Sequence, residues 1–429
     1  MRRAGISAVM ALLTACVLVA APAAAFTPEE IAAAANVARQ VEADVQTLAS
    51  DAFEGRGNEA PGGLAAREWI IDRLEPIAAG LAAGPGRAAY VQPFDVTSAN
   101  VVAVIPGTTH ADEFVVVGAH YDHFPPSGCR GLGSGDAICN GATDNASGVA
   151  VVLAIGRALR ALPAAPSRSV VLALWDGEES SLLGSRHFVN EEPLVPLGDV
   201  AAYVNFDIQG STLIPSLRDN SFAIGAESGG ELLTELTGAA IAATSLDTRR
   251  LSVTFGQGRS DYQPFWANEV PVVFFSDATN ACYHTTGDEV AIVDFAKLAK
   301  QAEIGFRLVV SLAESAERPT FAPLVAFDTY EDLLVLSELL TRSLADVPLL
   351  ESFWAGELVA LEAHARARVD AGSEAFGPTD ALLIAQDVLS IALNGLPCDP
   401  QLLPEPAAIG ACAAVATLAS LVRRRRREG

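Results

Sequence analysis

Residues 169–175 read SVVLALW, a run that is apolar at nearly every position. A strand with one face in water alternates apolar and polar residues, whereas a continuous apolar run predicts a strand that is covered on both faces. Five other runs have this composition: residues 100–105, 113–119, 201–207, 221–224 and 271–276. We therefore expect a sheet with helices packed on both sides.

Runs with helical periodicity lie between these predicted strands. They cover residues 63–77, 146–162, 182–191, 230–243, 261–268 and 294–315. An alternation of strands and helices is typical of an α/β fold. The sequence thus predicts an α/β domain over residues 26–317, with a mixed, mostly parallel sheet sandwiched by helices.

The first 25 residues have the composition of a signal peptide. Arg2 and Arg3 precede an apolar stretch at 8–21, and three alanines at 23–25 offer a small-residue cleavage site. Residues 13–16 read LTAC, which gives a lipoprotein cleavage box as the alternative. We expect an exported protein at the cell surface, in the periplasm or outside the cell.

Export makes disulfides possible. Cys129 and Cys139 flank a glycine-rich loop and are candidate partners, whereas the sequence does not pair Cys282, Cys398 and Cys412.

Two further segments follow the α/β region. After a linker at 319–329, residues 330–394 show only helical periodicity, and we expect a small helical appendage over 330–397. Residues 404–429 then combine Pro-Glu-Pro, an apolar run at 407–422 and five arginines. That run is short for a helix that spans a bilayer, which needs about 20 apolar residues.

The order of parts in residues 404–429 resembles a PEP-CTERM sorting signal. The resemblance implies membrane contact through the apolar helix before processing, and an exosortase-type processing enzyme as a partner. A plain membrane anchor flanked by positive charge is the alternative.

The charge balance excludes one class of partner. The chain has 52 acidic and 28 basic residues and a net charge of −24. A polyanion would be repelled, so we expect no nucleic-acid binding.

Five polar blocks follow the predicted strands or open a helix. They are GAHYDH at 118–123, GATDNASGV at 141–149, WDGEE at 175–179, NFD at 205–207 and CYHTTGD at 282–288. The carboxyl ends of the strands of an open α/β sheet are where binding sites form. Each block alone has an ordinary interpretation, such as a helix N-cap for Asp144.

Together the blocks indicate a metal site. They supply His120, Asp144, Glu179, Asp207 and His284, a set of nitrogen and carboxylate ligands that suits zinc better than calcium or magnesium. Five ligands exceed what one catalytic zinc needs, and a carboxylate shared between two ions accounts for the excess. Adjacent glutamates at a buried strand end are costly unless a cation or a partner neutralises them.

These blocks, in this order, closely resemble the zinc-dependent exopeptidases that include secreted bacterial leucine aminopeptidases, glutamate carboxypeptidase and glutaminyl cyclase. Residues 48–56 (LASDAFEGR) and 90–94 (YVQPF) also resemble the entry segments of these enzymes. The resemblance runs from about residue 40 to 315 and implies the zinc aminopeptidase fold with two zinc ions.

Carried over by position, the resemblance implies that Asp144 bridges both ions. Glu179 and His284 would complete one ion, and His120 and Asp207 would complete the other. It further implies that Glu178 is the general base, that Asp122 orients His120, and that the peptide bond between residues 144 and 145 is cis.

Residues 260–262 depart from the family, because Ser-Asp-Tyr stands where Ser-Asp-His is common. Tyr262 would either donate a hydrogen bond to the substrate or simply pack.

The implied activity is that of an aminopeptidase, which hydrolyses N-terminal residues from peptide substrates through a metal-bridging hydroxide. A glutaminyl cyclase on the same fold is disfavoured, because it uses a single zinc and both His120 and Asp207 are present for a second. A carboxypeptidase would need arginines near the pocket, and Arg130, Arg186 and Arg259 are candidates. A catalytically inactive surface-binding protein is the remaining alternative.

Overall fold

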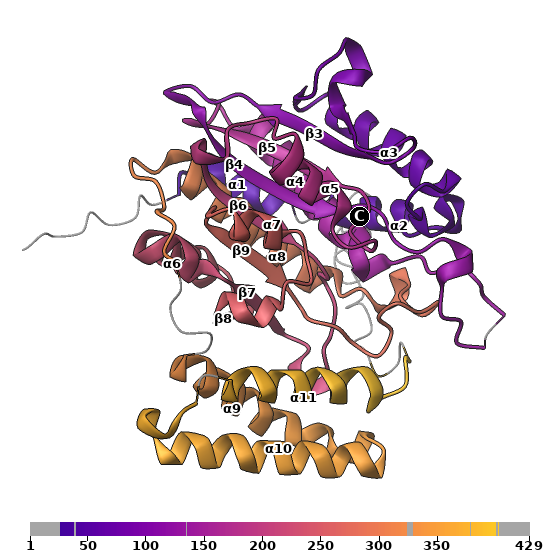
Figure 1. Ribbon diagram of the computed structural model, residues 1–429, viewed down its shortest axis with the longest axis vertical. Helices are drawn as coiled ribbons and strands as arrows, with labels where there is room; N and C mark the ends of the chain where they lie inside the picture. Colours follow the sequence, from indigo (N-terminus) through magenta and orange to yellow (C-terminus); the bar gives the residue numbers. More distant parts are fainter. Residues whose placement is uncertain are drawn as a thin grey trace, which may run out of the picture.

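One sheet forms the centre of the computed structural model, which describes residues 26–37, 40–133, 135–323, 329–377, 379–399 and 402 (Figure 1). Within those ranges the sheet has nine strands: β1 (Ala79–Gly80), β2 (Val91–Pro93), β3 (Ala99–Ile105), β4 (His110–His120), β5 (Arg168–Trp175), β6 (Val200–Phe206), β7 (Asn220–Ile224), β8 (Asp247–Leu251) and β9 (Val272–Ser276). Their spatial order is β1-β3-β5-β4-β6-β9-β7-β8, and β2 pairs with β3 beside this path.

The four central strands are parallel, and the antiparallel pairs lie toward the two edges. β5, β4, β6 and β9 run in one direction, whereas β3 is antiparallel to β5 and β7 is antiparallel to β9. The expected mixed α/β sheet is therefore confirmed, and its parallel centre brings the carboxyl ends of β4, β5 and β6 together.

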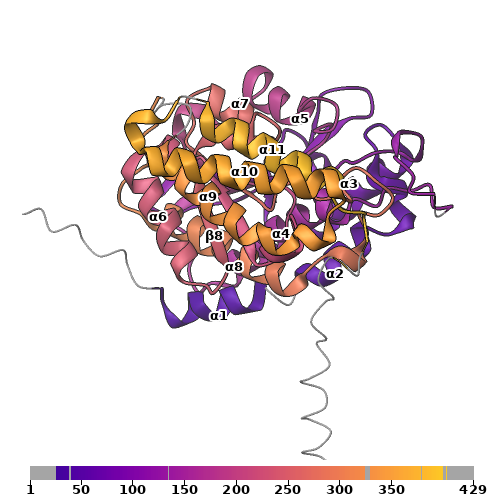
Figure 2. The same ribbon diagram turned by 90° about the horizontal axis from the view of Figure 1, so that it is seen from below.

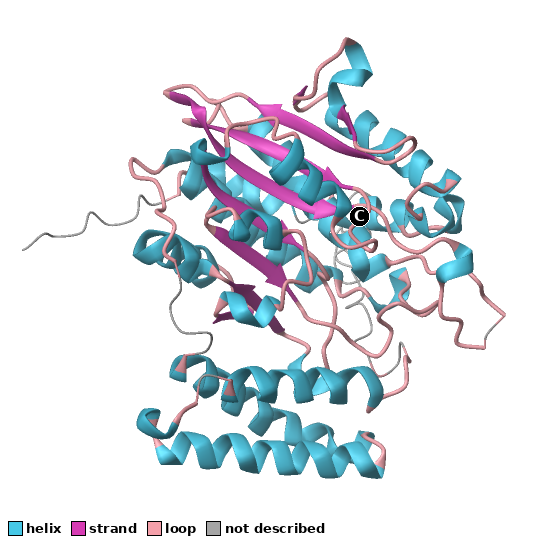
Figure 3. Cartoon of the chain, in the orientation of Figure 1, coloured by secondary structure: helices cyan, strands magenta, loops and turns pink. Residues whose placement is uncertain are grey.

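Alternate residues of the central strands contact different helical layers. In β4, Val115 and Val117 face one apolar cluster and Val116 faces the other. The first cluster is covered by α1 (Pro28–Val37), α2 (Val41–Leu48), α3 (Pro61–Leu74), α4 (Ser147–Ala161), α6 (Gly230–Ala242) and α8 (Phe295–Glu314). On the second face lie α5 (Leu183–Arg186) and α7 (Tyr262–Ala267), so helices flank the sheet on both sides (Figure 3).

Three helices after residue 329 extend the second layer. They are α9 (Tyr330–Ser343), α10 (Ser352–Ala371) and α11 (Asp380–Asn394), and they pack side by side (Figure 2). Leu333, Leu336 and Leu340 of α9 belong to the same apolar cluster as Phe222 and Leu251 of the sheet. The helices and the β7–β8 side of the sheet therefore share one continuous core.

The apolar runs predicted the long strands but not the short edge strands. β8 reads DTRRL, with two arginines and an aspartate, so its hydrophobicity gives no strand signal. The expected helix at 182–191 divides into α5 and a wider turn at His187–Glu191.

Two disulfides are present in the described ranges. Cys129 bonds to Cys139, and Cys282 bonds to Cys398 across 116 residues. The predicted signal peptide at 1–25 and the predicted sorting tail at 404–429 lie outside the described residues. No helix inside the described ranges has the length and apolarity to cross a bilayer.

Candidate metal centre and active site

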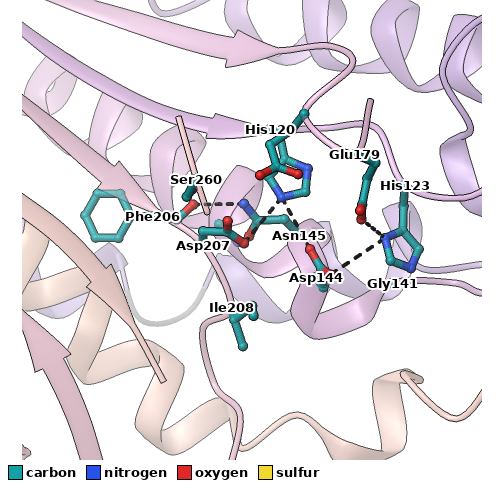
Figure 4. Close-up of polar contacts among 12 residues, drawn as sticks. His120, His123, Gly141, Asp144, Asn145, Glu179, Phe206, Asp207, Ile208 and Ser260 are labelled. Carbon is teal, nitrogen blue, oxygen red and sulfur yellow. Dashed lines mark hydrogen bonds and ion pairs between the residues drawn. The ribbon is translucent and has the colours of Figure 1, made fainter. Parts of the chain in front are cut away.

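The polar blocks converge at the carboxyl ends of three neighbouring parallel strands. His120 is the last residue of β4, Glu179 follows β5, and Asp207 directly follows β6. Asp144 lies in the turn Ala142–Ala146 that leads into α4, and His284 lies in the loop after β9. The structure thus brings all five candidate ligands to one place. Figure 4 shows four of them, His120, Asp144, Glu179 and Asp207.

Asp144 presents its two carboxylate oxygens to two different groups of side chains. Nε2 of His120 lies 3.3 Å from Oδ1 of Asp144 and 3.3 Å from Oδ1 of Asp207. Nε2 of His284 lies 3.1 Å from Oδ2 of Asp144 and 3.2 Å from Oε2 of Glu179. This is the arrangement that a carboxylate shared between two ions requires. The peptide bond between Asp144 and Asn145 is cis, as the sequence resemblance implies.

A third histidine, His123, enters the second group. Its Nδ1 lies 2.7 Å from Oε1 of Glu179 and 3.9 Å from Oδ2 of Asp144 (Figure 4). Its buried Nε2 has no hydrogen-bond partner among the residues that the structure describes. Sequence reasoning gave His123 no role. The available signal was its position three residues after His120 in the same strand-end block.

The charge of this cluster fits a bound cation. Asp144, Asp207 and Glu179 are nearly buried, and buried carboxylates are costly unless a positive charge compensates them. Burial alone would lower the pKa of His120, but the carboxylates of Asp207 and Glu178 outweigh it and hold that pKa well above its usual range. The field therefore favours positive charge, and the nitrogen and oxygen donors suit zinc. His120, Asp144 and Asp207 form one group that could hold a zinc ion, and His123, Asp144 and Glu179 form another.

Asp122 connects the first two blocks. Its carboxylate accepts hydrogen bonds from the backbone N–H groups of Glu178 at 3.0 Å and Glu179 at 3.3 Å. Nδ1 of His120 lies 3.1 Å from the backbone oxygen of Asp122 and 3.6 Å from its carboxylate. Asp122 thus lies against His120 and also fixes the backbone of the two glutamates.

Asp288 holds the turn that carries Asp144. One of its carboxylate oxygens accepts bonds from the backbone N–H and the hydroxyl of Thr143, at 2.9 and 2.8 Å, and the other accepts the N–H of Asp144 at 3.0 Å. Since Asp288 lies four residues after His284, it links the loops of two candidate ligands.

Arg56 links the residue after His120 to the segment that leads into the turn of Asp144. Its side chain is 0% exposed and donates to the backbone carbonyls of Leu48, Tyr121, Asn140 and Gly141. Sequence reasoning placed Arg56 in a family-like segment but did not identify this contact, because the four carbonyls come from three separate parts of the chain.

Glu178 lies beside the candidate ligands at the edge of a cavity. It lines this cavity together with Asp144 and Asp207. Burial, together with the negative charges of Asp207 and Asp261, raises the pKa of the Glu178 carboxyl well above its ordinary value. A carboxylate with a raised pKa is suited to accept and return a proton.

The rest of the cavity is largely apolar. Its wall includes Ile208, Phe222, Ile224, Phe255, Phe274 and Leu389. Of the candidate arginines, Arg259 lines this cavity with an exposed side chain, and Arg130 lines a neighbouring hollow beside His284.

Tyr262 contacts the cavity wall from behind. Its hydroxyl accepts the backbone N–H of Gly258 at 2.7 Å, and its ring stacks on Phe274 with centroids 5.1 Å apart. Its side chain is 2% exposed, which favours packing over substrate contact for this residue.

Comparison with known proteins gives a family match over the region of the site. Residues 100–309 match the model of Peptidase family M28. The mouse protein "Aminopeptidase NAALADL1" is 37% identical over 117 residues, which is 26% of this chain and 14% of the relative. "Leupeptin-inactivating enzyme 1" of Streptomyces exfoliatus is 26% identical over 272 residues, which is 59% of this chain and 53% of the relative. The chain therefore spans only a part of the length of these relatives.

Solved structures share the fold. The LapA aminopeptidase of Legionella pneumophila superposes with a TM-score of 0.55 at 18% identity, over 74% of this chain and 81% of that one. Porphyromonas gingivalis glutaminyl cyclase superposes with a TM-score of 0.50 at 18% identity, over 63% of this chain and 97% of that one. At this identity the likeness concerns the fold alone.

Proposed function

Since the chain belongs to peptidase family M28, as residues 100–309 indicate, we propose that it is a zinc-dependent aminopeptidase that uses two zinc ions to release N-terminal residues from peptides. One observation carries the proposal: Asp144 offers one oxygen to the His120–Asp207 pair and the other to the Glu179–His284 pair, with Glu178 beside them. When bound, zinc supplies the Lewis acidity that polarises a carbonyl and lowers the pKa of a water molecule.

The chain's own residues supply the proton transfer. Glu178 accepts the proton of the attacking water and then donates it to the leaving amine. The bonds from the Glu178 and Glu179 N–H groups to Asp122 fix both carboxylates relative to His120. This positions the base without reorganisation during the reaction, which is a large part of what an active site contributes.

The cavity supports a preference for apolar N-terminal residues. Phe222, Ile224, Phe274 and Ile208 surround the space next to Glu178. A leucine or phenylalanine side chain would bury its surface there, and burial contributes about 1.5–3 kcal/mol for such a side chain.

A carboxypeptidase is the second candidate, because Arg259 at the cavity rim could pair with a substrate carboxylate. Peptides with a blocked N-terminus and a free C-terminus separate the two activities. Cleavage of these peptides alone would replace the aminopeptidase assignment, and reaction only with N-terminal glutamine would favour a cyclase.

The test uses the full chain loaded with zinc. We expect two zinc ions per chain and chelator-sensitive hydrolysis of aminoacyl-arylamides. Glu178→Gln should lower kcat by about 10²–10⁴-fold, the range for loss of a general base, and keep both ions. Glu231→Gln, at an exposed glutamate of α6, is the matched control and should leave kcat unchanged. Turnover retained in Glu178→Gln would refute the assignment of the base.

We also propose that the protein is exported, and that its tail at 404–429 is a sorting signal which contacts the membrane and is processed by an exosortase-type enzyme. The two disulfides support export, because such bonds persist in oxidising compartments. Mass spectrometry of the mature protein from the native cell would detect loss of either terminal segment.

A further inference from the structure

Helix α11 reaches the cavity beside the metal centre, although it follows the family-matched region in sequence. Leu389 lines the same cavity as Asp144, Glu178 and Asp207. Leu393 and Asn394 line the neighbouring hollow together with Phe124, Tyr283 and His284. Leu389 and Leu393 are four residues apart and therefore lie on one face of the helix. This face of α11 is turned to the site.

The appendage is fixed to the sheet by polar contacts. Asp332 of α9 accepts bonds from both the N–H and the hydroxyl of Ser252, which follows β8. Farther along, the carboxylate of Asp346 accepts the N–H of Ser216 at 2.9 Å. Arg342 forms an ion pair with Asp247 at 2.7 Å. Together with the shared apolar core, these contacts hold α9–α11 in one position.

A disulfide fixes the end of α11 next to a candidate metal ligand. Cys398 lies four residues after the end of the helix, and it bonds to Cys282, two residues before His284. The bond joins the appendage to the loop that carries His284. The end of α11 and the His284 loop are therefore covalently linked.

From this geometry we propose that α11 is a wall of the substrate cavity, and that Leu389 limits the size of the N-terminal side chain that the cavity accepts. The identity of the substrate rests on the proposed aminopeptidase function, whereas the position of the wall does not. Leu389 lines the cavity together with the apolar residues Phe222, Ile224 and Phe274. A branched side chain at this point fills space that an indole would need.

The test compares Leu389→Ala with Leu383→Ala in the full zinc-loaded chain. Leu383 lies on the same helix but is 56% exposed and does not line the cavity, so it controls for general effects on α11. The kcat/KM for leucyl-, phenylalanyl- and tryptophanyl-arylamides is measured for each variant. A single methylene in such a pocket changes discrimination by about 10–200-fold, so we expect Leu389→Ala to raise the tryptophan-to-leucine ratio by at least about tenfold. The control should keep the wild-type ratio.

A second readout does not depend on turnover. Calorimetry measures the binding of free L-leucine and L-tryptophan to the same proteins, and Leu389→Ala should shift the ratio of their Kd values toward tryptophan. If the wild type binds both amino acids but hydrolyses no arylamide, a shifted binding ratio in Leu389→Ala still supports α11 as a wall of the cavity. Only the proposed aminopeptidase function is then refuted. An unchanged ratio for Leu389→Ala in both assays would refute the role of Leu389 in the cavity wall. A wild type that neither binds nor hydrolyses would overturn it as well.

The disulfide gives an independent variant. Cys282→Ser with Cys398→Ser removes the tether at the end of α11 and leaves the Leu389 side chain unchanged. We expect KM for the leucyl substrate to rise at least about tenfold, since the disulfide no longer holds the C-terminal end of the wall, with a smaller change in kcat. Equal KM values in this variant and the wild type would show that the tether does not hold the wall.

Discussion

The buried guanidinium of Arg56 holds the backbone next to two of the candidate ligands, His120 and Asp144. It donates to the carbonyls of Leu48, Asn140, Tyr121 and Gly141, at distances of 2.6–2.9 Å. Burial lowers the pKa of Arg56 to about 10, against the opposing influence of Asp288 and Asp144, so the side chain stays charged at neutral pH. Replacing it with methionine keeps much of the volume and removes every donor.

The expected loss follows from the carbonyls left behind. Each buried carbonyl without a donor costs about 1–3 kcal/mol, so four of them cost about 4 kcal/mol even at the low end. This would be a large part of the free energy of unfolding, which is about 5–15 kcal/mol for a typical protein. A loss of 1 kcal/mol lowers Tm by about 2–4 °C in larger domains, so we expect Arg56→Met to lower Tm by about 8 °C or more.

Thermal unfolding followed by circular dichroism measures this loss. Arg67→Met is the matched control, because the partly buried Arg67 donates to one carbonyl, that of Thr97 at 3.0 Å. We expect the control to lose about 1 kcal/mol. Arg56→Lys keeps the charge, but one ammonium cannot reach four carbonyls, so it should recover only part of the loss. If Arg56→Met and Arg67→Met had the same Tm, the four-carbonyl role of Arg56 would be wrong.

Three further outcomes are expected. His284→Ala should bind one zinc ion fewer per chain, because His284 is a candidate ligand beside Glu179. His123→Ala should keep two ions with weaker affinity, because His123 contacts Glu179 and orients it. Zinc is counted by plasma emission spectrometry, and the opposite result would make His123 the ligand and His284 the supporting residue. Asp288→Asn should lower kcat/KM at least about tenfold, because one oxygen no longer accepts the N–H groups that hold the turn of Asp144, and unchanged steady-state kinetics would contradict this. Burial and nearby acids raise the pKa of Glu289 from 4.5 to about 7, so between these values the folded state holds a proton that the unfolded state has lost. Glu289 should therefore contribute a fall in stability of about 1 kcal/mol as the pH rises through this window, after allowance for partial exposure. Urea titrations at pH 5 and pH 8 should show a total fall that is smaller by about this amount in Glu289→Gln.

The sequence predicted the parts of the fold that depend on local composition. Residues 169–175 are apolar throughout and become the fully buried strand β5. β8 could not be recognised, because Arg249 pairs with acids such as Glu338 on α9 and Arg250 donates to the backbone carbonyl of Thr234. That pairing exists only after the appendage has packed against the sheet.

The candidate site also has a part that the sequence predicts and a part that it does not. The convergence of the five candidate ligands could be predicted, since their order along the chain is itself a pattern and each lies at a strand end or in a turn or loop. Arg56 and Asp288 form hydrogen bonds with backbone groups of other loops. Every residue has a backbone carbonyl, so the sequence does not show which of these groups a distant side chain contacts. The contact of Leu389 with the cavity was beyond prediction for a related reason, because helical periodicity identifies an apolar face without naming the surface that it covers.

The buried acids connect metal binding to the stability of the fold. Burial raises the pKa of Asp207, Asp261 and Asp288, so each of these groups resists ionisation where it lies. The negative charge that remains in the cluster is offset by Arg56 and by His120 and His284, whose pKa values are raised by the carboxylates beside them. Bound zinc would replace those protons, and because the unfolded chain cannot assemble the site, part of its binding free energy would appear as folding stability. At a free zinc concentration 100 times Kd, each ion should add about 2.7 kcal/mol to the free energy of unfolding. A Tm that is the same with zinc and with chelator would mean that the acids are arranged for something other than a metal.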